Sequence, residues 1–218
     1  MLSRPIIIAI LVTIFAYLVG SINFAVIFTK LFIKQDVRNM GSGNAGTTNV
    51  LRVGGFLPGA LTFICDALKG FVAAGAGKLV FVFLAQNMNA DWSNAVYGAF
   101  LCGFLCMIGH VFPIFFQFKG GKGVATSVGI FAVCCPIAIV LGLVAFATST
   151  IITRIVSLSS LVATLVVVSL TIVFYDNTAL LWPQALLTCL MGAVVILKHS
   201  TNIKRLLSGT EKKIKIRR

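Results

Sequence analysis

The sequence has few charged residues, and very few of them are acidic. Charged residues make up 11% of the 218 residues and hydrophobic residues 59%, with Asp and Glu together numbering five. The mean hydropathy is +1.04. A soluble domain carries about 25% charged residues, so this composition excludes one. The uncharged run 6–29 exceeds the about 20 helical residues that cross a bilayer, and it is too long for a cleavable signal peptide. We therefore predict an integral membrane protein.

The sequence also lacks a pattern of metal ligands. All six cysteines lie in apolar segments, where a cysteine behaves as a small hydrophobic residue. Cys102 and Cys106 are one helical turn apart, but only His110 accompanies them. We expect no metal site and no cofactor.

Basic residues, by contrast, are abundant: 18 Lys and Arg give a formal net charge of +13. Such an excess is also typical of proteins that bind nucleic acid. In a membrane protein, however, basic residues gather in cytoplasmic loops, where anionic lipid headgroups are at hand. We therefore expect membrane lipids as partners, and no nucleic acid.

The hydropathy pattern predicts an all-α membrane protein formed by one polytopic domain, 1–218. The candidate membrane segments are 6–29, 56–77, 95–116, 124–152, 156–175 and 181–198.

The positions of the basic residues predict the topology. The N-terminus is placed outside, and the tail, with its eight basic residues from Lys198 onward, in the cytoplasm. Both termini can lie on these sides if the segment 124–152 forms a hairpin of two short helices. Pro136 predicts the break between them, because proline interrupts a helix interior. About seven transmembrane helices result. Five spans, with 124–152 only dipping into the membrane, satisfy the same topology.

A first polar loop, "GSGNAGTTNVLR" (41–52), combines glycines, hydroxyls, amides and one guanidinium without a carboxylate. Glycines let the backbone approach a ligand closely, and successive N–H groups form an anion-binding nest. The loop follows a membrane helix rather than a strand, so it is no dinucleotide fingerprint. A plain glycine turn with a helix cap at Thr47 or Thr48 is the alternative, but it leaves Arg52 and the two asparagines without a role.

A second polar loop, "FQFKGGKGVATS" (116–127), places glycines around Lys122 and predicts a helix that begins near Val124. The N-terminus of such a helix favours anions. The spacing is not that of a Walker loop. The alternative is an ordinary basic loop on the cytoplasmic side.

The basic tail predicts a short helix in which His199, Asn202 and Arg205 share one face and which Gly209 ends. We interpret Glu211, the only glutamate, as a structural partner of basic residues.

Two further polar groups lie in or next to membrane segments. Asp66 and Lys69 are costly within a membrane segment unless they pair or face a polar cavity. Arg154, with the nearby Ser160, either extends the anion site or only marks the topology.

Three segments together resemble the cytoplasmic motifs of the bacterial acyl-phosphate:glycerol-3-phosphate acyltransferases, the PlsY family. They are "GSGNAGTTNVLR", "FKGGKGVAT" and "HSTNIKRLLSGTE". The resemblance implies transfer of a fatty acyl group from acyl phosphate to the 1-position of glycerol 3-phosphate, giving lysophosphatidate and phosphate. It also implies the bacterial cytoplasmic (inner) membrane, an active site facing the cytoplasm, and an enzyme that produces acyl phosphate as a partner.

On this hypothesis the site residues fall into two groups. The candidate catalytic residues are His199, Asn202, Ser42, Arg52 and Lys122. The candidate phosphate-binding residues are Gly41, Gly43, Asn44, Thr48, Asn49, Gly120, Gly121, Gly123, Arg154, Ser160 and Arg205. Asp66, Lys69 and Glu211 are left without a catalytic role. A transporter of a phosphorylated solute is the rival hypothesis, although no internal repeat is visible.

Overall fold

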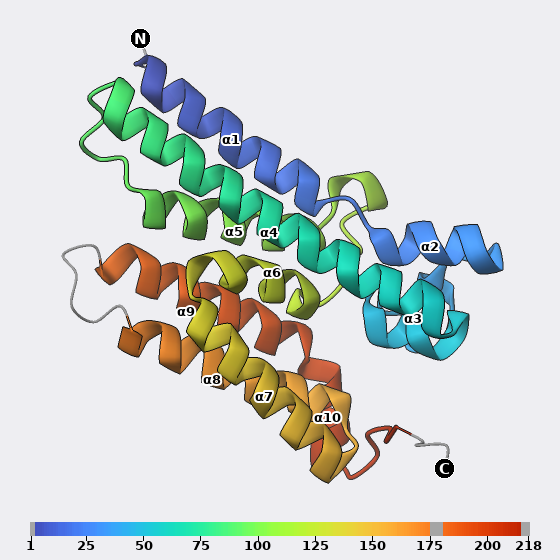
Figure 1. Ribbon diagram of the computed structural model, residues 1–218. Coiled ribbons are helices and arrows are strands. Elements are labelled where there is room, and N and C mark those ends of the chain that lie inside the picture. Colours follow the sequence, from blue (N-terminus) through green and yellow to red (C-terminus); the bar gives the residue numbers. More distant parts are fainter. Residues whose placement is uncertain (1–2, 175–180, 215–218) are drawn as a thin grey trace. The chain divides into compact units, whose positions relative to one another are not determined.

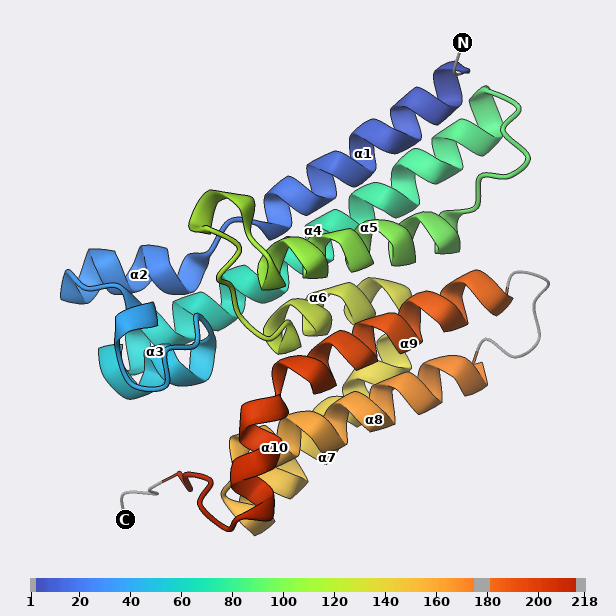
Figure 2. The same ribbon diagram turned by 180° about the vertical axis from the view of Figure 1, so that it is seen from behind.

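The computed structural model describes residues 3–174 and 181–214, and within them every regular element is helical (Figures 1 and 2). The helices are α1 (Arg4–Gly20), α2 (Phe24–Ile33), η1 (Val37–Asn39), α3 (Thr47–Gly54), α4 (Phe56–Asn87), α5 (Ala95–Val111), η2 (Ile114–Phe116), α6 (Val124–Cys134), α7 (Pro136–Thr153), α8 (Val156–Phe174), α9 (Leu181–Lys198) and α10 (Ser200–Leu207). Helices are expected here because a bilayer offers no hydrogen-bond partners to the backbone.

The chain divides into two compact units, Met1–Cys134 and Cys135–Arg218. In the first unit the long helix α4 packs against α1, α5 and α6, with α1 and α5 also in contact (Figures 1 and 2). The polar connections before α4 and after α5 lie at one end of this bundle, near α2 and α3. The first unit thus gathers both glycine-rich loops at the same end.

Small residues allow these helices to approach one another closely. A Cβ on Gly20 of α1 would lie 2.1 Å from the backbone oxygen of Cys106 in α5, and one on Gly129 of α6 would meet the backbone of Ala67 in α4. Contacts of this kind are typical of membrane helix packing, because lipid supplies no hydrophobic force between helices. Glycine at these positions therefore fixes the spacing of the bundle.

In the second unit α8 packs between α7 and α9, and α10 follows α9 after a bend of 58°. Arg154, with φ of 60°, ends α7 in the left-handed conformation. Across the described helices many large apolar side chains are exposed, among them Leu11, Ile152 and Trp182. Exposed apolar surface on this scale fits contact with lipid rather than water.

The helix boundaries confirm the break at Pro136 and correct two other expectations. The predicted run 6–29 is not one helix: it breaks at residues 21–23, and α2 begins where the Asn23 side chain caps the backbone N–H of Val26. The predicted segment 56–77 continues as α4 to Asn87, so this helix includes Lys78. Hydropathy alone missed both, because the Asn23 side chain caps the start of a new helix within an apolar run, while Lys78 is tolerated at an exposed helical position.

Five of the described helical segments are long and apolar enough to cross a membrane, or up to six if the bent pair α9 and α10 counts as one span. Helix α6 has 11 residues. Such a helix rises only about 16 Å, well short of a hydrocarbon core about 30 Å thick. The number of seven transmembrane helices and the orientation of the termini stay predictions.

Candidate active site

The first polar loop is built around the side chain of Asn49, which is 2% exposed. Its Oδ1 accepts from the backbone N–H of Ser42 at 2.9 Å. Its Nδ2 lies 3.2 Å from the carbonyl oxygen of Val37, 2.9 Å from that of Met40 and 3.1 Å from that of Asn44. One amide thus satisfies backbone groups that a loop would otherwise leave unpaired, and it fixes the loop's shape.

The glycines of this loop make room for that amide. Gly41 and Gly43 have φ of +60° and +71°, a conformation that residues with a Cβ rarely adopt. A Cβ on Gly41 would also lie 2.3 Å from Oδ1 of Asn49. Folded in this way, the loop leaves Ser42, Thr48 and Arg52 exposed.

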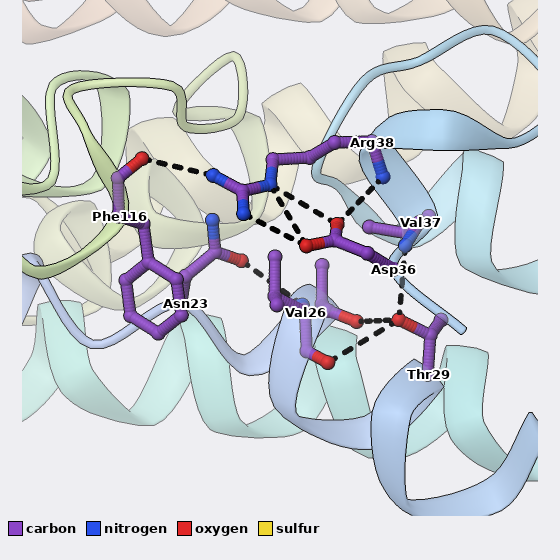
Figure 3. A network of polar contacts seen from close by, with 8 residues as sticks. Asn23, Val26, Thr29, Asp36, Val37, Arg38 and Phe116 are labelled. Carbon is purple, nitrogen blue, oxygen red and sulfur yellow. Dashed lines mark hydrogen bonds and ion pairs between the residues drawn. The ribbon is translucent and has the colours of Figure 1, made fainter. Parts of the chain in front are cut away.

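A second set of contacts ties the segment just before this loop to the turn after α5 (Figure 3). Nη2 of Arg38 pairs with Oδ2 of Asp36 at 2.7 Å, and Nη1 of Arg38 donates to the carbonyl oxygen of Phe116 at 2.9 Å. The guanidinium of Arg38 holds the pKa of the Asp36 carboxyl below its usual range, against the opposing effect of burial. The only acidic group near the two loops in sequence is therefore already neutralised by an arginine.

The second polar loop is held against the end of α5. The N–H of Gly121 donates to the carbonyl oxygen of His110 at 3.2 Å. A Cβ on Gly121 would lie 2.2 Å from Nε2 of His110 and 2.7 Å from the carbonyl oxygen of Ala45, in the first loop. The backbones of the two loops therefore touch, and α6 begins directly after them at Val124, as predicted.

The electrostatics of this end of the first unit favour an anion. Residues 39–55 and 112–123 contain Arg52, Lys119 and Lys122 but no Asp or Glu. Arg52 and Lys119 are exposed, and Lys122 is half-buried and has a polar partner. Two glycine-rich backbones, a helix N-terminus and several cations together form a surface suited to phosphate.

In the second unit the carboxylate of Glu211 connects the tail to the start of α8. Oε1 accepts from Ser157 Oγ at 2.8 Å and from Asn202 Nδ2 at 2.7 Å, and Oε2 accepts from Arg205 Nε at 2.6 Å. Burial raises the pKa of Glu211, but these hydrogen bonds outweigh it and hold that pKa below the usual range. Asn202 and Arg205 do share one face of α10, and both bond to Glu211.

His199 stands just before α10 and is 2% exposed. Its Nδ1 lies 2.8 Å from the carbonyl oxygen of Val195. A carbonyl oxygen only accepts, so this contact requires the proton on Nδ1. In the neutral ring Nε2 is then the basic nitrogen. Within the described residues no cluster of three or more His, Cys, Asp or Glu could hold a metal ion.

Comparison with known proteins assigns the family. The model of a family described as glycerol-3-phosphate acyltransferase matches residues 10–209. A glycerol-3-phosphate acyltransferase of Thermoanaerobacter sp. (strain X514) is 41% identical over 209 residues, which cover 94% of this chain and 96% of that protein. The chain belongs to the glycerol-3-phosphate acyltransferase family.

Other members of the family show the same extent of similarity. Glycerol-3-phosphate acyltransferase 2 of Bacillus anthracis is 39% identical over 205 residues, covering 94% of this chain and 98% of that one. The crystal structure of PlsY, an integral membrane glycerol 3-phosphate acyltransferase, in its glycerol 3-phosphate form has a TM-score of 0.80 at 33% identity, covering 95% of this chain and 96% of that chain. The lysophosphatidic acid form of PlsY has a TM-score of 0.77 at 32% identity, with 95% of each chain covered. This acyltransferase is therefore a multi-pass integral membrane enzyme, and the transporter hypothesis is set aside.

The predicted site residues of this glycerol-3-phosphate acyltransferase family member divide between the two units. The first unit holds Ser42, Arg52, Lys122 and the glycines of both loops, and the second holds Arg154, Ser160, His199, Asn202 and Arg205. Asn49, predicted to bind phosphate, has its amide bonded to the loop backbone. Ser160, with the same predicted role, donates to the carbonyl oxygen of Val156 at 2.9 Å. These roles stay predictions.

Sequence reasoning overlooked three residues that organise this region. Asp36 and Arg38 directly precede the first motif, but a pair of charges two residues apart carried no signal that it would reach Phe116. His110 was weighed only as a neighbour of two cysteines, whereas it contacts the second loop. Both contacts join segments that are far apart in the sequence, so local patterns could not reveal them.

Proposed function

We propose that this enzyme transfers a fatty acyl group from acyl phosphate to the 1-position of glycerol 3-phosphate, forming lysophosphatidate and phosphate at the start of phospholipid synthesis. The observation that carries the proposal is the meeting of the two carboxylate-free, glycine-rich loops at one end of the first unit. Both proposed substrates carry phosphate, and a cationic surface beside the membrane suits a reaction that joins a soluble anion to a lipid. In support, the PlsY structures are described as glycerol 3-phosphate and lysophosphatidic acid forms.

The first unit would bind phosphate. Arg52 and Lys122 supply positive charge, Ser42 and Thr48 supply hydroxyl groups, and the backbone at 120–123 supplies N–H groups that lead into α6. Neutralising the charge of the leaving phosphate and aligning the two substrates would remove much of the barrier, because acyl phosphate is an activated donor.

The bond changes are simple. A hydroxyl oxygen of glycerol 3-phosphate attacks the acyl carbonyl carbon, a new ester C–O bond forms, and the C–O bond to phosphate breaks. The hydroxyl proton goes either to Nε2 of His199 or to a phosphate oxygen of the donor. The hydrogen bond from Nδ1 of His199 to the carbonyl oxygen of Val195 would orient the ring.

The deciding experiment is lysophosphatidate formation by purified protein in detergent. Glycerol 3-phosphate is supplied with palmitoyl phosphate in one reaction and with palmitoyl-CoA in another. We expect product from the acyl phosphate alone. Product only from the thioester would keep acyl transfer but remove the proposed donor, and no product from either would contradict the proposal.

The identity of the proton acceptor is tested with His199→Gln. A general base contributes about 10²- to 10⁴-fold to a rate, so loss of that size in kcat is expected if Nε2 takes the proton. Retention of most of kcat with a raised KM would instead make His199 a binding residue and leave proton transfer to the donor phosphate.

We also propose that the enzyme lies in the bacterial cytoplasmic (inner) membrane with its phosphate-binding loops facing the cytoplasm. The basic residues of the loops and of the tail support this orientation by the positive-inside rule. Glycerol 3-phosphate would then come from the cytoplasm, and an enzyme that forms acyl phosphate would be a partner.

A further inference from the structure

A buried group of charged and polar side chains lies beneath the two loops of the first unit. Asp66 and Lys69 belong to α4 and His110 to α5, and their exposed fractions are 1%, 4% and 5%. Oδ1 of Asp66 lies 2.8 Å from Nζ of Lys69 and 3.5 Å from Nδ1 of His110. We refer to these three residues as the buried triad. None of them belongs to the phosphate-binding set proposed above.

One end of the buried triad holds the break between α1 and α2. Nζ of Lys69 donates to the carbonyl oxygen of Ile22 at 2.7 Å, and it lies 5.6 Å from the ring centroid of Phe24. The break frees that carbonyl from helical hydrogen bonding, so a buried partner is needed. Asp66 and Lys69 therefore each contact fixed neighbours in addition to one another.

The other end of the buried triad touches the second loop. The imidazole of His110 packs so closely against Gly121 that a Cβ there would lie 2.2 Å from Nε2. A Cβ on Gly120 would meet the carbonyl oxygen of His110, and the N–H of Gly121 donates to that same oxygen. Two successive peptide units of the loop therefore rest on one residue of α5.

The cost of the buried triad points to a role beyond packing. Ionised groups within membrane segments are expensive, and well-packed apolar residues fill such a space at lower cost. Here the triad links the carbonyl of Ile22, two membrane helices and the backbone that precedes Lys122. The buried triad thereby fixes the position of Gly120 and Gly121.

We propose that His110 is a positioning residue for the loop 120–123, held in place by Asp66 and Lys69, and that it sets the geometry with which this loop binds a phosphate group. This inference rests on the proposed function, because it takes the loop to be the phosphate-binding element. His110 acts through the backbone of Gly120 and Gly121 and needs no contact with substrate.

A double-mutant cycle tests the inference in the full-length protein in detergent. The variants are His110→Ala, Gly121→Ala and the two combined. The readouts are the Kd of glycerol 3-phosphate, from its effect on the thermal unfolding midpoint, and the KM values of both substrates. We expect each single change to weaken binding about 10-fold or more, and the double variant to resemble the worse single variant. Losses that multiply would show that His110 does not act through Gly121.

Two further variants separate positioning from mere stability. Cys102→Ala removes a buried side chain from the same helix, where it packs against Gly77 of α4, and it should lower the unfolding midpoint without changing the Kd. His110→Gln keeps a polar group of similar reach and should restore part of the Kd lost in His110→Ala. If His110→Ala behaves like Cys102→Ala, the inference is wrong.

The experiment also keeps the two proposals apart. Wild-type protein that binds glycerol 3-phosphate without forming product contradicts the proposed function, and the Kd cycle still decides the role of His110. Wild-type protein that neither binds nor reacts contradicts both.

Discussion

At the scale of single residues, two side chains act as centres around which a loop is ordered. Asn49 bonds to four backbone groups of the first loop, and Glu211 accepts from Ser157, Asn202 and Arg205. Both belong to motifs whose chemistry suggests direct substrate binding. In the structure these polar atoms bond to the protein and shape the loops that bear the exposed groups, and the phosphate contact expected of Asn49 stays a prediction.

Replacing Asn49 with Ala should therefore impair both stability and activity. An unpaired buried polar group costs about 1–3 kcal/mol, and Asn49→Ala would leave several. We expect a lower unfolding midpoint and a loss of at least about 10-fold in kcat/KM for lysophosphatidate formation. Asn39→Ala is the matched control, because Asn39 is exposed in the same segment. Equal effects of the two changes would rule out a special role for Asn49.

Glu211→Gln should destabilise the protein by about 1–3 kcal/mol, since the amide cannot accept from three donors as the carboxylate does. The effect should depend on pH. The folded-state pKa of Glu211 is lowered, so its stabilisation is present above the unfolded value of about 4.3 and is lost as the pH falls through the folded value. Unfolding midpoints of the two proteins should differ at pH 7 and converge below about pH 4. A constant difference across this range would contradict the assignment.

At the scale of elements, glycine decides how closely the helices of the first unit pack. A Cβ on Gly129 would overlap the carbonyl of Ala67, whereas one on Gly75 in the middle of α4 would meet nothing within 4 Å. The two positions look alike in the sequence, where each glycine lies within an apolar helix. Only the neighbouring helix distinguishes them.

Alanine substitutions at these two glycines should thus have opposite effects. Gly129→Ala must push α6 away from α4, and overpacking of this kind typically costs about 1–3 kcal/mol. Gly75→Ala relieves the low helix propensity of glycine and should be neutral or stabilising by up to about 1 kcal/mol. Thermal unfolding in detergent measures both, and a similar loss at the two positions would argue against the packing of α4 and α6.

At the scale of the whole molecule, charge and hydropathy together predict how the chain crosses the membrane. The loops around α3 and before α6 and the tail are basic, while the connection between α4 and α5 carries Asp91 and no Lys or Arg. The positive-inside rule therefore predicts that the first three lie on the cytoplasmic side.

Labelling of introduced cysteines checks this topology. Cysteines introduced at Asn39 and Ser208 should react with a membrane-impermeant maleimide in inverted vesicles, and one at Asn89 should react in right-side-out vesicles. The protein without an introduced cysteine is the control, since its six native cysteines lie in helices or, for Cys135, at the helix break. Labelling of Asn39 and Ser208 from opposite sides would require a different number of crossings.

Much of this structure follows from local features of the amino-acid sequence. Apolar runs long enough to span a bilayer, the break at Pro136 and the start of α6 after Gly123 follow from interactions within a few residues. The three motifs also indicated the family, because each brings particular residue types together at short spacings. The break at residues 21–23 was not predicted. It frees the carbonyl oxygen of Ile22, and the partner of that oxygen is Lys69, 47 residues further along the chain.

Tertiary packing determines which of the polar residues support the site and which are exposed on it. Arg38 reaches Phe116, Asp66 lies beside His110, and His110 supports Gly121 only after α4, α5 and the loops have packed together. Such contacts depend on side-chain geometry between distant segments, and in a membrane they matter because a buried polar group without a partner is costly. Spacing along the chain carries the chemistry of the motifs, whereas packing determines which of their atoms are used to hold the fold.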